Sequence, residues 1–557
     1  MTFGILEDKH LQRVPGTALL SDLGVLHGQE ITIDEAGTLK RGTGRHAHVI
    51  LVPQPSDDPA DPLNWPRWKK EACFWTLAFA ASLDGALSPM VGPGYVLLSE
   101  QFGVSVDEIA SSFGAILLGL ACFMLFQGAL AVKFGHRIVY LGSVTLMFIS
   151  CIWCAASPNL ASIRASRVFQ GFGMSALQSL VASTIEQIYF VHERGNRSVI
   201  WSFSIMSGIT LGPLLYSYVI QNLSWQMGFW FVSIPLGITM FLVFFFVPET
   251  SYRRPHPTAS EMSKRSSSDE AMAQSSRTSE NNEKSNIEER QSPAATVGDA
   301  NSGNQTFLSQ LKLWHGTFSD DSLFKIFLRP FPFVLSPVTV YIFLVHGMQT
   351  VWLSLLPICS STIFTIEYGF NASQIGLTNL GGIVGIVLAA AVTGPLTDWG
   401  TIWLARHNKG IYEPEFRIFF ISTMLMGTFG YAGWAVGTTH NMPWIGAVAC
   451  LTLANFSMVT SGSAAVTYLL DTHGPNALHV LALSNLFKNV VLYSFTFFAN
   501  GMVESRGVKV SLLILAGCQT FCWLASIPMY VFGKRLRSWI ARHPRLFVVE
   551  ANDAPRT

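Results

Sequence analysis

The chain has 557 residues, of which 50% are hydrophobic and only 13% are charged. Soluble proteins of this size carry roughly a quarter charged residues, so the composition excludes an ordinary soluble globular protein. The net charge of +1 gives no reason to expect nucleic acid or an acidic substrate as a partner.

Runs of about 20 apolar residues, each long enough to cross a bilayer as a helix, account for the low charge. We predict spanning helices at 72–95, 109–131, 138–157, 163–187, 198–220, 227–247, 331–357, 374–396, 416–437, 443–469, 478–500 and 510–533. The predicted fold class is therefore an all-α membrane protein with twelve transmembrane helices in two pseudo-symmetric six-helix bundles.

These spans divide the chain into five regions. We expect a cytosolic N-terminal tail (1–70), an N-terminal bundle (71–250), a disordered cytosolic linker (251–328), a C-terminal bundle (329–534) and a cytosolic C-terminal tail (535–557). The linker contains almost no aromatic or β-branched residues and cannot bury enough apolar surface to order itself. Its serines suit phosphorylation, and an inert tether is an equally good interpretation.

The charge of the loops predicts the orientation in the membrane. Basic residues collect in alternate loops: Lys133/Arg137, Arg194/Arg197, Arg253/Arg254, Lys325/Arg329, Arg406/Lys409 and Lys534/Arg535/Arg537. The intervening loops are acidic or neutral, with Arg506 and Lys509 as the exception, so both termini are expected in the cytosol. The sequons at Asn222 and Asn371 then lie in outer loops and are candidate glycosylation sites.

A glycine-rich basic stretch, Gly128 to Arg137 with Gly135 inside it, has a fainter counterpart in Gly394-Pro-Leu-Thr-Asp398. Glycine permits a sharp turn between two spans, and two copies at matching places indicate an internal repeat. The first copy has cations without an acid, and the second keeps the acid. We expect the two loops either to approach one another as a shared latch or each to pair with neighbouring helices.

Charged side chains at bilayer depth are functional candidates because they are costly there. Asp84 lies mid-way along the first span, and Arg167 lies in the fourth. A carboxylate in such a place could bind and release a proton, as a proton-coupled carrier requires. The competing interpretation makes Asp84 a structural partner of Arg167 that never titrates.

Small residues recur every four positions in the fifth span, at Ser204, Gly208 and Gly212, and lead into Pro213. Such a stripe allows close helix packing, and glycine followed by proline softens a helix. We therefore predict a hinge at Gly208, Gly212 and Pro213.

In the C-terminal bundle, polar residues share helix faces and are predicted to line a central cavity. This set comprises His346, Gln349, Trp352, Asn485, Lys488 and Asn489. For His346 we consider both a proton carrier and a donor to substrate. Three interpretations stand for Lys488: an interior charge opposite Asp471, a gate for a phosphate-like group, or a side chain that snorkels to the interface.

Hydrolytic, phosphate-cradling and metal-ligand motifs are missing from the sequence, and so is the Gly-x-x-x-x-Gly-Lys-Ser/Thr loop. We therefore expect no enzyme activity, no cofactor, no metal site and no use of ATP by this chain.

Several motifs carry a resemblance to a known family. They are Gly128 to Arg137, Arg167-Val-Phe-Gln-Gly171, Gly208-Ile-Thr-Leu-Gly-Pro213, Ser224 to Trp230, Val247-Pro-Glu-Thr250, Asp57 to Trp65 and Gly410 to Arg417. Together they resemble the major facilitator superfamily, and within it the fungal twelve-span drug:proton antiporter-like branch. The sequence departs from the family at Val132, where an aspartate is usual, and at Tyr216 and Ser217, where a glycine pair is usual.

The resemblance implies that Arg167 takes part in proton coupling and that Gly212 and Pro213 shape the antiporter hinge. It implies a monomeric fungal plasma-membrane carrier that exports a small amphipathic molecule, such as a secondary metabolite, toxin or drug, in exchange for protons. The rival interpretations are proton-coupled uptake of a nutrient cation or polyamine, and a membrane sensor that does not transport.

Overall fold

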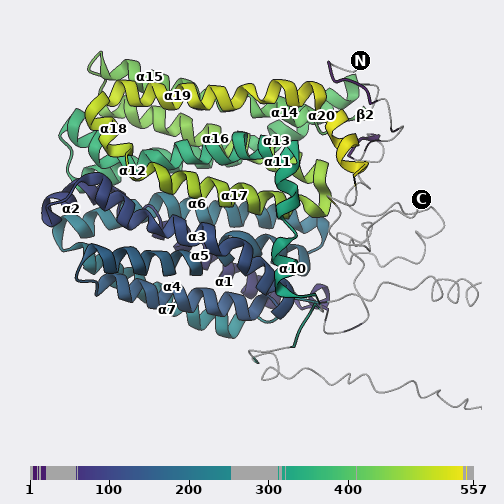
Figure 1. Ribbon diagram of the computed structural model, residues 1–557, viewed down its shortest axis with the longest axis horizontal. Helices are drawn as coiled ribbons and strands as arrows, with labels where there is room; N and C mark the ends of the chain where they lie inside the picture. Colours follow the sequence, from purple (N-terminus) through teal and green to yellow (C-terminus); the bar gives the residue numbers. More distant parts are fainter. Residues whose placement is uncertain are drawn as a thin grey trace, which may run out of the picture.

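The computed structural model describes residues 4–8, 11, 14, 16–19, 58, 61–252, 312, 316–319, 321–408, 411–543 and 547. Its helices run roughly parallel in two groups, with the N-terminal half below and the C-terminal half above (Figure 1). Most of the predicted disordered linker (251–328) lies outside the described residues.

The N-terminal half consists of helices that begin and end close to the predicted spans. They are α1 (Arg67–Leu87), α2 (Tyr95–Phe102), α3 (Val106–Phe134), α4 (His136–Ala155), α5 (Leu160–Ile188), α6 (Val191–Asn222) and α7 (Trp225–Phe246). A 3₁₀ turn, Gly92–Gly94, joins α1 to α2, and another, Pro62–Asn64, precedes α1. Several helices start where a side chain caps free backbone N–H groups, as Ser105 does for α3.

The C-terminal half is more interrupted. It contains α10 (Leu323–Leu328), α11 (Pro337–Ile342), α12 (Met348–Tyr368), α13 (Ala372–His407), α14 (Phe416–Ile421), α15 (Met424–Thr438), α16 (Trp444–His473), α17 (Ala477–Phe495), α18 (Ala499–Arg506), α19 (Val508–Leu524) and α20 (Ser526–Ala541). A π-helical turn, Phe343–Gly347, joins α11 to α12. Short 3₁₀ turns lie at Phe331–Leu335 and Gly474–Asn476.

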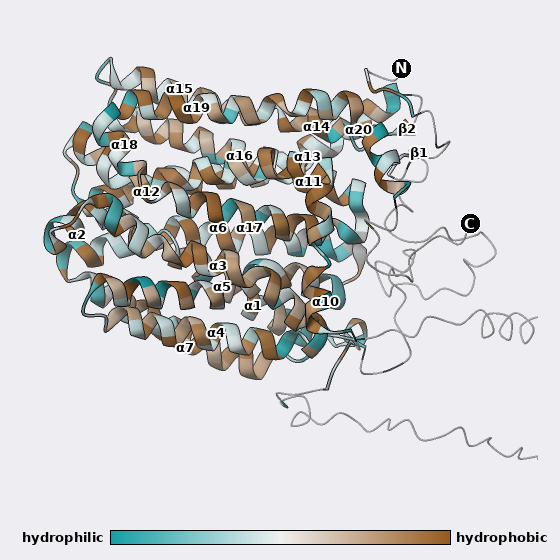
Figure 2. Ribbon diagram, viewed as in Figure 1, coloured by the Kyte–Doolittle hydropathy of each residue, from teal (hydrophilic) through white to brown (hydrophobic). Residues whose placement is uncertain are grey.

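Among the described residues, ten helical segments are long and apolar enough to cross a membrane, and the bent pair α17–α18 makes an eleventh. α5 has 29 residues and packs against both α3 and α4, but its arginines lower its hydropathy. With α5 as the twelfth helix, the predicted all-α membrane fold class is confirmed. Brown, apolar residues run along the helices of both halves (Figure 2). Phe241 of α7 and Phe521 of α19 are 62% and 71% exposed.

The two halves meet along α3 against α17 and α6 against α13. On the side of the termini, the segment before α10 crosses to the N-terminal half: the Phe318 amide donates to the Lys133 carbonyl at 2.8 Å, and Lys133 Nζ donates to the Asp321 carbonyl at 3.2 Å. Lys325 donates a hydrogen bond to Asp321, and Arg329 adds a second cation, so the pKa of the Asp321 carboxyl lies below its usual range.

The N-terminal residues pack on the other half of the molecule. Strand β1 (Ala18–Leu19) pairs antiparallel with β2 (Ile411–Tyr412), with Ala18 opposite Tyr412. Ile5 is fully buried against Ala405, Tyr412 and Phe416. The N-terminal residues precede the N-terminal half in the sequence, yet they are anchored on the C-terminal half.

The two glycine-containing stretches differ from their prediction. Gly128 lies inside α3, and the turn falls at Gly135 alone, where φ is +94°. Gly394 and Asp398 lie inside the 36-residue helix α13, so the predicted turn between the eighth and ninth spans is wrong at that place. Pro395 does not end α13, because proline is tolerated within a long packed helix.

Candidate functional site

Asp84 is the buried acid of the N-terminal half. It lies one turn before the end of α1 and has no exposed surface. Gln178 of α5 donates to Asp84 Oδ2 at 3.1 Å, whereas Oδ1 has no hydrogen-bond partner in the described structure. An ionised carboxylate with one unsatisfied oxygen is costly in this environment, which favours either a bound proton or a ligand.

Glycines bring α6 into backbone contact with α1 beside Asp84. A Cβ added at Gly208 would overlap the Ser82 carbonyl, and one at Gly212 would lie 2.9 Å from Ala86 atoms. Gly85 in turn faces the Ile205 carbonyl. The small-residue stripe therefore supports close packing around the acid. Pro213 lies within α6, which continues to Asn222; hinge motion at these residues remains a prediction.

Arg167 is fully buried, but its partners are not Asp84. Its guanidinium donates to the carbonyls of Phe113 (3.1 Å) and Leu87 (3.0 Å) and to Gln170 Oε1 (2.6 Å). It also lies over the rings of Phe113 and Phe229. Leu87 is the last residue of α1, so Arg167 satisfies a terminal carbonyl and complements the helix dipole there. The alternative that paired Asp84 with Arg167 is therefore wrong.

His346 lies in the π-helical turn before α12, a distortion that is frequent at functional sites. Its ring faces Gly462 of α16, where an added Cβ would lie 3.2 Å from Nδ1, and Nδ1 has no hydrogen-bond partner among the described residues. The unpartnered Ser484 hydroxyl lies beside Gly347, the next residue along the chain. Two groups without a hydrogen-bond partner among the described residues, His346 Nδ1 and the Ser484 hydroxyl, thus lie at this turn.

Gln349 and Trp352 of α12 lie in different surroundings. Both ends of the buried Gln349 amide are occupied, because Nε2 donates to Ser457 at 3.2 Å and Oε1 accepts from Ser461 at 2.5 Å. The Trp352 ring packs edge-on against Phe495 at 5.5 Å, and its indole N–H has no partner in the described structure. Gln349 thus holds α12 to α16.

Lys488 of α17 lies close enough to Asp84 of the other half to attract its ionised form, but the described residues show no salt bridge between them. The same charge repels a protonated His346. Asn485 is half-buried on the same helix, and the buried Asn489 has an unpartnered amide Nδ2 among the described residues.

The interpretation that placed Lys488 opposite Asp471 is wrong. Asp471 Oδ2 accepts from Arg417 Nε at 2.5 Å and from the Tyr412 hydroxyl at 2.6 Å.

The Gly135–Arg137 turn is completed by an acid from the end of α7. Glu249 accepts from the amides of His136 (2.9 Å) and Arg137 (3.2 Å), and the Arg137 guanidinium donates to the carbonyls of Val247 and Phe244. A Cβ at Gly135 would overlap the Glu249 carboxylate. The turn therefore has an acid beside it, Glu249, although position 132 holds a valine. The Asp398 side chain lies outside the described side chains, so the shared latch stays a prediction.

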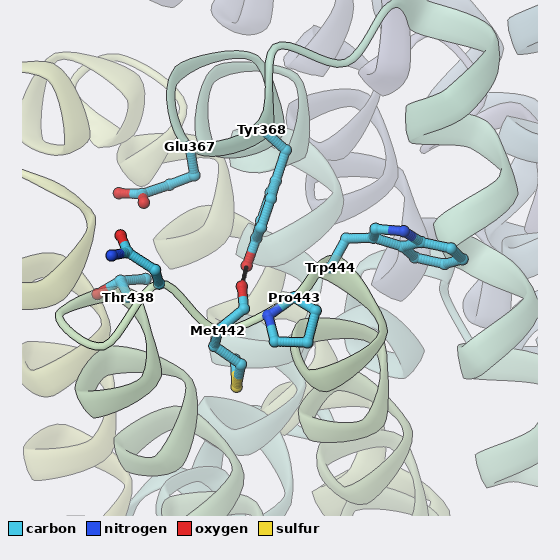
Figure 3. A pocket seen from close by; sticks show the side chains of 7 residues that line it. Glu367, Tyr368, Thr438, Met442, Pro443 and Trp444 are labelled. Carbon is cyan, nitrogen blue, oxygen red and sulfur yellow. Dashed lines mark hydrogen bonds between the residues drawn. The ribbon is translucent and has the colours of Figure 1, made fainter.

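A separate hollow of about 270 Å³ lies at the ends of α12, α15 and α16 far from the termini (Figure 3). It is lined by Glu367, Tyr368, Thr438, Asn441, Met442, Pro443 and Trp444, and the Tyr368 hydroxyl donates to the Met442 carbonyl at 3.1 Å. The hollow contains none of the predicted site residues. The predicted glycosylation residues lie at this same end: Asn222 ends α6, and Asn371 caps the N-terminus of α13.

Sequence reasoning missed Gln178, Ser484 and Glu249 as partners in these sites. Gln178 and Ser484 are polar groups inside apolar runs, a signal that could have singled them out. Glu249 falls within the Val247-Pro-Glu-Thr250 motif, which gives no indication of its partners.

The fold and its site define a class of protein: a polytopic carrier with two helical bundles and charged groups buried where they meet. Residues 74–491 match the Major Facilitator Superfamily model, and the chain belongs to this family of transporters.

Full-length relatives are found among fungal proteins. The chain is 25% identical to protein HOL1 of Saccharomyces cerevisiae over 96% of this chain and 97% of that protein. It is 25% identical to efflux pump radE of Floropilus chiversii, over 96% and 92% of the two chains. It is 29% identical to MFS antiporter QDR3 of Candida albicans over only 39% and 30%.

Among solved structures, the D-xylose–proton symporter aligns with a TM-score of 0.56 at 14% identity, covering 84% of this chain and 99% of that one. This similarity supports the fold alone. Because it belongs to the Major Facilitator Superfamily, the chain is a secondary transporter of a multi-pass membrane family and not an enzyme.

Proposed function

We propose that this protein is a proton-coupled efflux carrier of the fungal plasma membrane that exports a small amphipathic organic molecule by alternating access. Relatives named as an efflux pump and an antiporter support export. The two bundles would rock around a central site near the bilayer midplane. Asp84 would carry the proton, and His346, Trp352, Asn485 and Asn489 would contact the cargo.

The observation that carries the proposal is the setting of Asp84. Its carboxyl group is fully buried, keeps one oxygen free of hydrogen bonds in the described structure, and interacts with Lys488 of the opposite half. Protonation would weaken that attraction and cargo binding would perturb it, so one group can couple both events. Arg167 has its donors committed to backbone carbonyls and Gln170, which supports a role in positioning the outer end of α1.

Transport in membrane vesicles tests the direction and the coupling. In inside-out vesicles with an acidic lumen, protons leave while the probe, the amphipathic dye rhodamine 6G, accumulates in the lumen. We expect a protonophore to abolish this accumulation and Asp84→Asn to reduce it at least tenfold. The control Glu100→Gln changes an exposed acid and should leave it unchanged. If dye accumulation by Asp84→Asn still depends fully on the proton gradient, Asp84 does not take part in the coupling step.

A second candidate function is uptake of an organic cation, favoured by the free carboxylate oxygen of Asp84. Radiolabelled spermidine in right-side-out vesicles distinguishes it. Accumulation that occurs only down an inward proton gradient would establish uptake and exclude export.

A further inference from the structure

The eleventh span is broken near its outer end. α17 ends at Phe495, and α18 begins at Ala499 after a bend of 47°. The N-cap of α18, Phe498, offers no side-chain hydrogen bond. The first N–H groups of an α-helix have no partner within the helix, and they carry the positive end of its dipole. The break therefore creates a site that needs an acceptor.

The acceptor comes from the other half of the molecule. Asp107, in the first turn of α3, accepts from the Asn500 amide through Oδ1 and from the Gly501 amide through Oδ2, both at 2.8 Å. A Cβ at Gly501 would lie 2.8 Å from Asp107 Oδ2. The glycine thus permits a carboxylate of the N-terminal half to cap a helix of the C-terminal half.

A second contact repeats this arrangement at the same end of the bundle. Gln221 Oε1, near the end of α6, accepts from the Ala372 amide at the start of α13 at 3.1 Å. Asn500 is itself held in place, because its side-chain oxygen accepts from Thr362 of α12 at 2.8 Å. Side chains of one half thus bind the N-termini of two helices of the other half, on the side away from the chain termini (Figure 1).

We propose that Asp107 is a gating residue whose bonds to α18 hold the outer ends of the two halves closed. Charge-assisted hydrogen bonds to a helix N-terminus are stronger than neutral ones. Both must break when the outer side opens. This inference rests on the proposed alternating-access cycle but not on the cargo, the direction of transport or the coupling ion.

Thiol labelling of the full chain in intact cells tests the gate without any substrate. Asn489→Cys places a thiol at a buried position of α17, and a membrane-impermeant maleimide is added outside. Asp107→Asn removes the charge and turns one acceptor into a donor facing backbone N–H groups. We expect the labelling rate at residue 489 to rise at least fivefold. Glu108→Gln changes the exposed neighbouring acid and should leave the rate within twofold of the parent.

The native Cys151, buried in the N-terminal half, reports unfolding in the same sample. Faster labelling at residue 489 with Cys151 protected supports the gate, as does a parent-like rate in Asp107→Glu, which keeps both acceptor oxygens. An unchanged rate in Asp107→Asn, or an equal rise in Glu108→Gln, would overturn it. Failure of this test leaves the proton-coupling result on Asp84 intact, since the two readouts are independent.

Discussion

At the scale of single residues, one carboxylate from a distant part of the sequence completes the turn before α4. The turn at Gly135 lacks an acid at Val132, yet Glu249 supplies one from the end of α7. Four backbone amides donate to this carboxylate: those of His136, Arg137, Thr250 and Ser251. The N-terminus of α4 is thereby capped, and the Arg137 guanidinium binds the carbonyls of Val247 and Phe244.

We expect Glu249→Gln to lower the free energy of unfolding by about 2 kcal/mol, because a neutral amide offers one acceptor in place of two and places a donor beside backbone donors. Thermal unfolding of the purified protein in nanodiscs measures the loss. Glu367→Gln, a change at an exposed acid, should stay within about 0.5 kcal/mol of the parent. Equal melting temperatures for the two variants would contradict the capping role.

Residue types alone predicted Asp84 and Arg167 as buried groups, because a charged side chain within an apolar run is costly unless it faces the interior of the bundle. For Lys488 an interior position was one of three interpretations, and its side chain is half-buried. Their partners could not be predicted. Arg167 binds carbonyls of α1 and α3, and every residue has a carbonyl, so the sequence carries no signal for that choice.

At the scale of elements, the N-terminal strap, residues 4–8, 11, 14 and 16–19, is held by several kinds of contact. Beyond the β1–β2 pairing, Thr17 donates to Glu413 at 2.7 Å, and Lys534 binds both Glu7 and Glu413. Arg537 lies buried between Glu413 and Glu415 beneath it. The strap therefore covers an ion cluster that water would otherwise solvate. Burial of apolar surface favours docking of the strap, and desolvation of the buried charges opposes it.

Two glycines of the strap form a matched pair for testing this docking. Gly4 and Gly16 have φ of +86° and +87°, but only Gly16 is crowded: a Cβ there would lie 2.6 Å from the Asp471 carbonyl. Alanine costs both sites backbone strain, and it adds a clash only at Gly16. We expect Gly16→Ala to reduce disulfide formation in a Leu19→Cys/Ile411→Cys chain severalfold.

Gly4→Ala should leave the disulfide yield of that chain within twofold, since open space surrounds this residue. Yields that fall equally in both variants would mean that strain, not the fit of Gly16 against Asp471, sets the docking.

Hydrophobic runs placed the starts of most spans within a few residues, because a run of about 20 apolar residues in a membrane protein is most often a spanning helix. These runs did not predict the end of the span 331–357, since α12 continues to Tyr368. They failed where helices leave the bilayer or break. α13 continues to His407, beyond the predicted end at 396. The predicted span 478–500 crosses the α17–α18 break, where Thr496, Phe497 and Phe498 include neither glycine nor proline.

At the scale of the whole molecule, each half joins the end of its last helix to the start of its third span through a charged side chain. This side chain is an acid in one half and a cation in the other. In the N-terminal half, an acid after the sixth span, Glu249, binds the start of the third. In the C-terminal half, a cation near the end of the last helix, Arg537, binds Glu413 and Glu415 just before α14. The corresponding helix ends are thus joined in both halves, by an acid that binds backbone amides in one half and by a cation that binds carboxylates in the other.

The end of the bundle that holds these charge clusters should face the cytosol. Figure 1 shows β2, α10 and the end of α20 at this end. The strap pairs with β2, and the turn at Gly135 lies beside the segment before α10, since the Lys133 carbonyl accepts from the Phe318 amide. Basic residues concentrate there: Lys133, Arg137, Arg194, Arg197, Lys325, Arg329, Arg406, Lys534 and Arg535. Positively charged short loops are retained on the cytosolic side during insertion, so this distribution predicts the orientation.

We therefore expect an epitope tag at either terminus to bind antibody only after permeabilisation. A tag inserted after Asn441, in the loop between α15 and α16 at the opposite end, should bind antibody on intact cells. Glycosidase treatment should increase gel mobility, and the shift should disappear in Asn222→Gln/Asn371→Gln, whose acceptor amides lie at that outer end. Terminal tags that react on intact cells would reverse the orientation, and Asp107 would then close the cytosolic side instead.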